Sequence, residues 1–166
     1  MNPPAGDLLE LIQQQISPHW SFEETKPARR PKGAAETESE LVLCCSSGGQ
    51  QISYRGRQEK PDPNSAPVWT EDYGLIVRAG HPRRTGRRIV FLMAGAHSLG
   101  TGAACLATTS TKLIKEIRSR LCGKTNQDIL ADKDAGIWIL VKGTVRSPDF
   151  HLYEDNVKIV DVGTFG

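Results

Sequence analysis

The most organised pattern of apolar and polar positions runs from Ile89 to Leu121. Ile89 to Met93 are continuously apolar, which predicts a short strand covered on both faces, as in a parallel sheet. Small residues follow, and apolar side chains then recur every three or four positions, which predicts one face of an α-helix. The helical positions are Ala103, Leu106, Ala107, Ser110, Leu113, Ile114, Ile117 and Leu121. This stretch therefore predicts a strand, a glycine loop and a helix.

Weaker patterns predict the remaining elements. In chain order we expect a helix at 7–16, a linker at 23–40, strands at 41–45, 69–78 and 89–93, the helix to 121, and strands at 136–146 and 157–162. Breakers and a lack of periodicity make 54–67 an exposed excursion. The turn between the strands at 73–77 and 89–93 is short, so these strands should pair as an antiparallel hairpin. The last two strands should form another hairpin or lie side by side.

These elements predict an α/β domain of Rossmann-like, three-layer architecture with a mixed, partly parallel sheet. Residues 1–40 are expected to form an N-terminal helix and a mobile linker rich in Pro and Arg. Residues 41–166 are expected to form the α/β domain. At 166 residues one domain is expected, and 38% hydrophobic content with 10 Pro and 16 Gly indicates that part of the chain is not packed.

Composition narrows the function classes. A net charge of +2 is too close to neutral to indicate nucleic-acid binding. Cys44, Cys45, Cys105 and Cys122 lack the C-x-x-C spacing of redox or zinc sites, so free thiols in a reducing compartment are expected, with Cys105 on the buried helix face. Neither a signal segment nor a membrane-length apolar run is evident. We expect a soluble cytoplasmic protein without membrane contact.

The glycine loop is the main candidate for a ligand site. Its spacing, Gly95 to Gly100, matches part of a phosphate-binding loop, but the Lys and Ser/Thr of that motif are replaced by Thr101 and Gly102. The Rossmann fingerprint also fails in part, because no acidic residue ends a next strand at the required distance. A generic anion cradle at a helix N-terminus remains. The predicted ligand-binding residues are Gly95, His97, Ser98, Gly100, Thr101 and Gly102.

The same loop supports an alternative, a serine nucleophile. Ala96-His-Ser-Leu-Gly100 resembles the nucleophile elbow of α/β-hydrolases, with the Leu99 N–H as an oxyanion donor. That chemistry needs an acid and a histidine, and only His151 follows the serine. This alternative is a small hydrolase that uses Ser98 and His151.

A purely structural interpretation explains the loop equally well. The glycines then permit a tight crossing from strand to helix, Ser98 or Thr101 caps the helix, and His97 is a satisfied loop histidine. No ligand is required.

The run Asp72-Tyr-Gly-Leu-Ile-Val-Arg78, together with Ala94-Gly-Ala-His-Ser-Leu-Gly-Thr-Gly-Ala-Ala104, resembles a group of bacterial Rossmann-like modules found in signalling and conflict-type proteins. In those modules an apolar strand ends in A-G-x-H-x-x-G-T-x-A-A before a helix. The resemblance covers about residues 72 to 121. It implies a sensor or interaction module and brings no catalytic residues.

The sequence pattern does not indicate a functional site at the other candidate residues. The densest positive cluster consists of Arg78, His81, Arg83, Arg84, Arg87 and Arg88, and it lies at the opposite end of the predicted strand from His97. It is therefore expected to be a solvated turn or a separate docking surface. Trp138 is expected in the core. Asp132 and Asp134 lack companions at metal-ligand spacing, so no metal is predicted.

The sequence thus predicts a non-catalytic module for sensing or interaction, without a cofactor. Its expected partners are a nucleotide or other anionic small molecule, or a protein.

Overall fold

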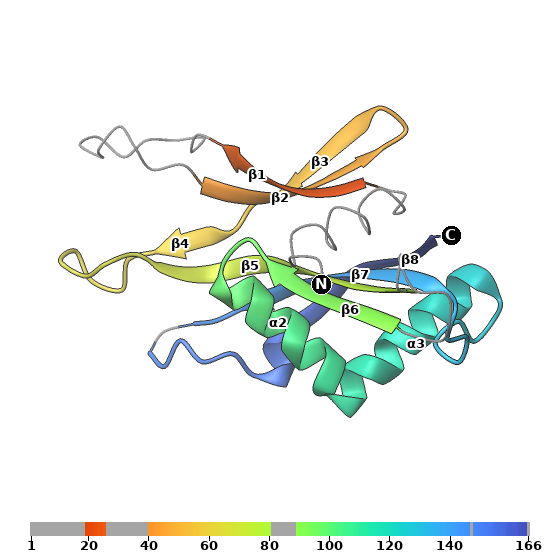
Figure 1. The fold of residues 1–166 in the computed structure, drawn as a ribbon. Helices are drawn as coiled ribbons and strands as arrows, with labels where there is room; N and C mark the ends of the chain where they lie inside the picture. The colour runs from red at the N-terminus through yellow and green to blue at the C-terminus, as the bar shows by residue number, and fades with distance from the viewer. Residues whose placement is uncertain (1–18, 26–39, 81–88, 147, 166) are drawn as a thin grey trace, which may run out of the picture.

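The computed structural model describes residues 19–25, 40–80, 89–146 and 148–165, and Figure 1 shows their arrangement. Two β-sheets and a pair of helices form the described part of the chain. The strands are β1 (His19–Thr25), β2 (Glu40–Ser47), β3 (Gln50–Tyr54), β4 (Arg57–Glu59), β5 (Val68–Gly80), β6 (Ile89–Gly95), β7 (Gly136–Thr144) and β8 (Val157–Phe165). The helices are α2 (Ser98–Thr109), α3 (Thr111–Thr125) and the short 3₁₀ helix η1 (Glu154–Asn156).

The larger sheet is built on the long strand β5. β7 pairs with one edge of β5 and β8 follows β7, while β4 and β6 share the other edge. Every one of these pairings is antiparallel. The predicted hairpin of 73–77 with 89–93 is confirmed, as is the pairing of the last two strands.

The prediction of a Rossmann-like α/β fold with a partly parallel sheet was wrong. β6 and β7 both pair antiparallel with β5, so they run in the same direction, and the helices carry the chain from one to the other. The strand, glycine loop and helix therefore form a crossover, as the local pattern indicated. The crossover passes over an antiparallel strand, however, so β6 and β7 are separated by β5 and never pair.

Helices α2 and α3 cover one face of the larger sheet. Ala103, Ala104 and Ala107 of α2 are fully buried, and their small side chains let the helix lie close to the strands. The core on this face also contains Ile76, Leu113, Ile117, Leu121, Ile137, Ile139, Val141, Val157, Ile159 and Val162. The single predicted helix is broken at Ser110, which has an extended backbone and accepts the Leu113 N–H on its side chain. The hydroxyl thus starts a second helix.

A second, three-stranded sheet of order β1-β2-β3 lies over the opposite face of the larger sheet (Figure 1). Trp20 of β1 packs against Trp138 of β7 with ring centroids 5.2 Å apart. Leu43, Cys45, Leu75, Val77, Ala79 and Leu140 complete this core. The expectation that Trp138 belongs to the core is confirmed, since it is buried. The layers are therefore sheet, sheet and helices.

The structure differs from the prediction at two other places. Strand β1 lies inside the segment 1–40 that was predicted as a helix and linker, whereas the predicted helix at 7–16 lies outside the described residues. Cys105 is exposed, so its predicted burial was wrong. Within the described ranges, no helix combines the length and apolar character that a membrane crossing requires.

Candidate functional site

The glycine loop between β6 and α2 is closed by a carboxylate of the protein itself. Asp72 of β5 is fully buried, and its Oδ2 accepts the backbone N–H of His97 at 2.9 Å and of Gly100 at 2.8 Å. Exposed N–H groups and the helix dipole make a helix N-terminus favour an anion. The anion in this structure is Asp72, which occupies donors that the sequence assigned to a ligand.

The glycines of the loop permit very close backbone contact. A Cβ at Gly100 would lie 2.2 Å from the Tyr73 carbonyl oxygen and 2.6 Å from Asp72 Oδ2. A Cβ at Gly95 would lie 2.2 Å from the Thr101 nitrogen. By contrast, the nearest atom to a Cβ at Gly102 would be Leu152 Cδ2, at 3.4 Å. Gly95 and Gly100 are thus required by packing, and Gly102 is not.

His97 is held from two sides. Its Nδ1 lies 3.4 Å from Asp72 Oδ1, and its ring stacks on Trp69 with centroids 3.5 Å apart and an interplanar angle of 19°. Trp69 in turn lies over Gly56, where a Cβ would come within 2.7 Å of the indole ring. The side chain of His97 is 17% exposed. This environment is that of an anchored loop histidine with one face against an aromatic ring.

Two hydroxyls of the loop have different environments. Thr101 Oγ1 donates to the His97 carbonyl oxygen at 3.3 Å and accepts the Gly95 N–H at 3.0 Å, so it connects the two ends of the loop. Ser98 is exposed at the start of α2. None of the described side chains is hydrogen-bonded to its hydroxyl.

The geometry gives no support to the predicted nucleophile and base. A serine nucleophile needs a histidine within hydrogen-bonding reach, yet neither His97 nor His151 bonds to Ser98 among the described residues. The His151 ring packs instead against Tyr153, at 4.9 Å between centroids.

No family model, curated protein or solved structure matches this chain. The resemblance to bacterial signalling modules therefore stays a prediction.

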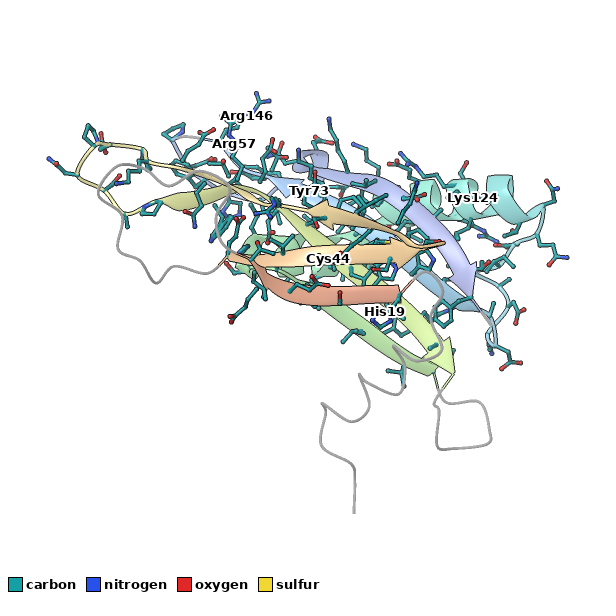
Figure 2. The ribbon with its side chains drawn as sticks, turned by 90° about the horizontal axis from the view of Figure 1, so that it is seen from above. His19, Cys44, Arg57, Tyr73, Lys124 and Arg146 are labelled. Carbon is teal, nitrogen blue, oxygen red and sulfur yellow. The ribbon has the colours of Figure 1, made fainter. Side chains whose placement is uncertain are left out.

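A hollow of about 280 Å³ lies away from the glycine loop, where β4, β5 and β7 meet. It is lined by Arg57, Glu59, Thr70, Glu71, Thr144, Val145 and Arg146. Figure 2 shows Arg57 and Arg146 near each other along the upper edge of the view. Arg57 pairs with Glu59 at 3.0 Å and Glu71 pairs with Lys142 at 2.7 Å. Within the described ranges, no carboxylate lies within ion-pairing distance of Arg146.

Arg78, the one member of the predicted arginine cluster among the described residues, is not part of a solvated turn. Arg78 is buried, and its guanidinium donates to the carbonyl oxygens of Ile129, Leu130, Asp132 and Ala135 at 2.6 to 3.1 Å. Burial lowers the pKa of Arg78, and the nearby Asp132 opposes this effect. Arg78 thus fastens the loop before β7, and the other members of the cluster lie outside the described residues.

Strand β6 exposes a row of apolar side chains that the sequence interpretation missed. Phe91 is 55% exposed, Met93 37% and Ile89 36%. These residues alternate with Val90 and Leu92, which pack against the core between the two sheets. The alternation was present in the sequence, but an uninterrupted apolar run conceals it, because every second residue is also apolar. We call Ile89, Phe91 and Met93 the β6 row.

Proposed function

We propose that this chain is a non-catalytic interaction module that binds a protein partner along strand β6. The observation that supports it is the exposure of the β6 row. Large apolar side chains grouped on a surface are typical of interaction sites, whereas isolated ones are ordinary. Three consecutive outward positions on one strand form such a group.

The position of β6 in the sheet adds to this argument. Among the described strands β6 pairs only with β5, so its other side is a free edge. Free edges are usually protected by charged residues, proline or a bulge. From Ile89 to Gly95 the strand has no charge and no proline, and its pairing with β5 shows no register shift. An edge of this kind is suited to accept a strand from another protein.

The neighbouring helix α2 also lacks charged residues, so the uncharged surface extends beyond β6. Helix α2 contains no charged residue from Ser98 to Thr109. Thr108 of α2 lies beside the β6 row, since its hydroxyl is 3.4 Å from Met93 Sδ. In a chain with 24% charged residues, an uncharged helix beside an uncharged edge strand favours a surface that is covered in use.

A photo-crosslinking amino acid at Phe91 tests this proposal. Ile52 of β3 is the matched control, because it is 53% exposed but is flanked along its strand by the polar Gln51 and Ser53. We expect a discrete adduct from position 91 in cells, identified by mass spectrometry, and none of comparable yield from position 52. Equal yields at both positions, or no adduct at 91, would contradict the proposal.

A second candidate function is the binding of an anionic small molecule, such as a nucleotide, in the hollow near Arg146. Its support is the convergence of Arg57 and Arg146 with Thr70 and Thr144. Guanidinium and hydroxyl groups bind phosphate through charge-assisted hydrogen bonds. Thermal shift with ATP and with inorganic phosphate tests it, using Arg146→Ala and the exposed control Lys115→Ala. Stabilisation lost only in Arg146→Ala is the expected result.

A further inference from the structure

We propose that the partner at the β6 edge is a second copy of this chain, paired antiparallel about a two-fold axis at Phe91. This inference rests on the proposed function and specifies its partner. It follows from the direction of the backbone groups of β6, from the symmetry of the β6 row and from its lack of charge.

The backbone bond at the end of β6 shows which groups face outward. Ala96 N–H donates to the Tyr73 carbonyl oxygen at 3.4 Å, and residues 73 and 96 continue the register of β5 with β6. Bonded pairs in an antiparallel ladder recur at every second residue. The β6 residues bonded to β5 are therefore Ala94, Leu92 and Val90.

The remaining residues of β6 direct their N–H and C=O groups away from β5. They are Ile89, Phe91, Met93 and Gly95. The Gly95 N–H has an acceptor inside the protein, Thr101 Oγ1 at 3.0 Å, which ends the free edge on that side. The free backbone groups thus belong to the same three residues whose side chains form the β6 row.

A two-fold axis at Phe91 uses all of these groups. Phe91 then lies opposite its own copy, and Ile89 lies opposite Met93 of the second copy. Each of these is a bonded pair, so the register forms about six backbone hydrogen bonds. If the register shifted by one residue, the outward N–H and C=O groups of one copy would face residues of the other copy whose N–H and C=O groups already bond to β5.

The side chains fit the same arrangement. The cross-strand neighbours of Met93 and Phe91 on β5 are Ile76 and Arg78. Ile76 belongs to the core beneath the helices, so the β6 row lies on the helix face. Pairing two copies would join the rows into one apolar strip. A two-fold axis also brings like charges together, and an edge without charges avoids that repulsion.

Sedimentation equilibrium across a range of concentrations tests the association. We expect a monomer–dimer equilibrium for the full chain. Phe91→Lys places two like charges opposite each other and should raise the dimer dissociation constant at least about tenfold. Ile52→Lys, at a position of similar exposure on the other sheet, should leave it unchanged.

Disulfide crosslinking tests the register in a Cys105→Ser background, because Cys105 is exposed. Bonded pairs have Cα atoms about 5.5 Å apart, which a disulfide can span. Phe91→Cys should therefore form a crosslinked dimer, as should the double variant Ile89→Cys/Met93→Cys. Ile89→Cys alone should not, since the two copies of Ile89 would be about 13 Å apart along the strands.

The outcomes separate the two proposals. A chain that is monomeric at all concentrations, yet gives position-91 adducts with another protein, overturns the two-fold dimer and keeps the interaction function. A dimer that tolerates Phe91→Lys, or that crosslinks as readily through Ile89→Cys alone, also overturns the inference. Absence of both a dimer and adducts overturns the proposed function as well.

Discussion

Asp72 Oδ2 accepts the backbone N–H of Gly100 at 2.8 Å, across 28 residues of chain. The bond joins the middle of β5 to the first turn of α2. It also explains why the glycine loop is so compact, since Gly100 lies against both the backbone and the carboxylate of β5. The stability of this junction should therefore depend on Asp72.

Replacing Asp72 should destabilise the protein, and alanine should do so more than asparagine. Asp72→Asn keeps an acceptor but removes the charge at the helix N-terminus, and should cost about 1–2 kcal/mol. Asp72→Ala leaves two N–H groups without their acceptor, and should cost about 3 kcal/mol or more. Urea unfolding measures both variants. Equal stability of the Asn and Ala variants would show that the acceptor is unimportant, and unchanged stability of Asp72→Asn would show that the charge is.

Substitution of Gly100 and of Gly102 by alanine should have very different effects on stability. Gly100→Ala places a Cβ against the Tyr73 carbonyl and should cost about 3 kcal/mol. Gly102→Ala meets only the tip of Leu152 and should be neutral or stabilise by up to about 1 kcal/mol, because alanine favours a helix. Thermal unfolding of the pair measures this difference. Similar melting temperatures for both variants would contradict the close contact.

Even the conservative substitution Arg78→Lys should destabilise the protein. Arg78→Lys retains the charge but lacks the planar fork that reaches four carbonyl oxygens, so we expect a loss of about 2–3 kcal/mol. Hydrogen exchange should rise at 129–135. Arg120→Lys, whose guanidinium pairs with Glu116 on the exposed side of α3, is the control and should have little effect. Unchanged exchange in the Arg78 variant would show that the loop is fastened in another way.

Alkaline pH should weaken the contact between the sheets. Burial raises the pKa of Cys45, and Asp161 adds to this effect. The folded pKa then exceeds the unfolded one, so the contribution of the thiol is complete below about pH 9 and is lost as pH rises through the folded pKa. Unfolding free energy should fall more from about pH 8 to about pH 10 in the unaltered chain than in Cys45→Ala. Equal slopes would contradict this assignment.

The hydrolase alternative yields a simple prediction about Ser98. Its hydroxyl has no described histidine within bonding reach, so we expect no labelling by a fluorophosphonate probe that depends on this residue. Intact mass spectrometry of the unaltered chain and of Ser98→Ala measures it. Labelling that disappears only in Ser98→Ala would restore the hydrolase hypothesis.

Local structure was predictable where sequence neighbours determine it. The strand at 89–93, its hairpin with 73–77 and the pairing at the C-terminus were all confirmed, because strands that follow one another along the chain usually pair. The glycine loop was also recognised. The direction of the sheet was not, since a strand followed by a helix has the same pattern whether the next neighbour is parallel or antiparallel.

Long-range contacts account for the other differences. Nothing near Asp72 in the sequence indicates that its carboxylate caps a helix that starts at Ser98. Arg78 appeared to belong to a solvated cluster, and its four acceptors lie about fifty residues later. The free edge of β6 was hidden because a run that is apolar at every position also describes a fully covered strand.

The pairing of Trp20 with Trp138 has a consequence during synthesis. Strands β1 to β3 leave the ribosome well before β7, which carries the tryptophan that completes their shared core. Among the described residues the small sheet packs only on the larger sheet, and a sheet with one uncovered apolar face is unstable in water. Strands β1 to β3 should therefore not fold stably until β7 emerges, and they would depend on chaperones in that interval.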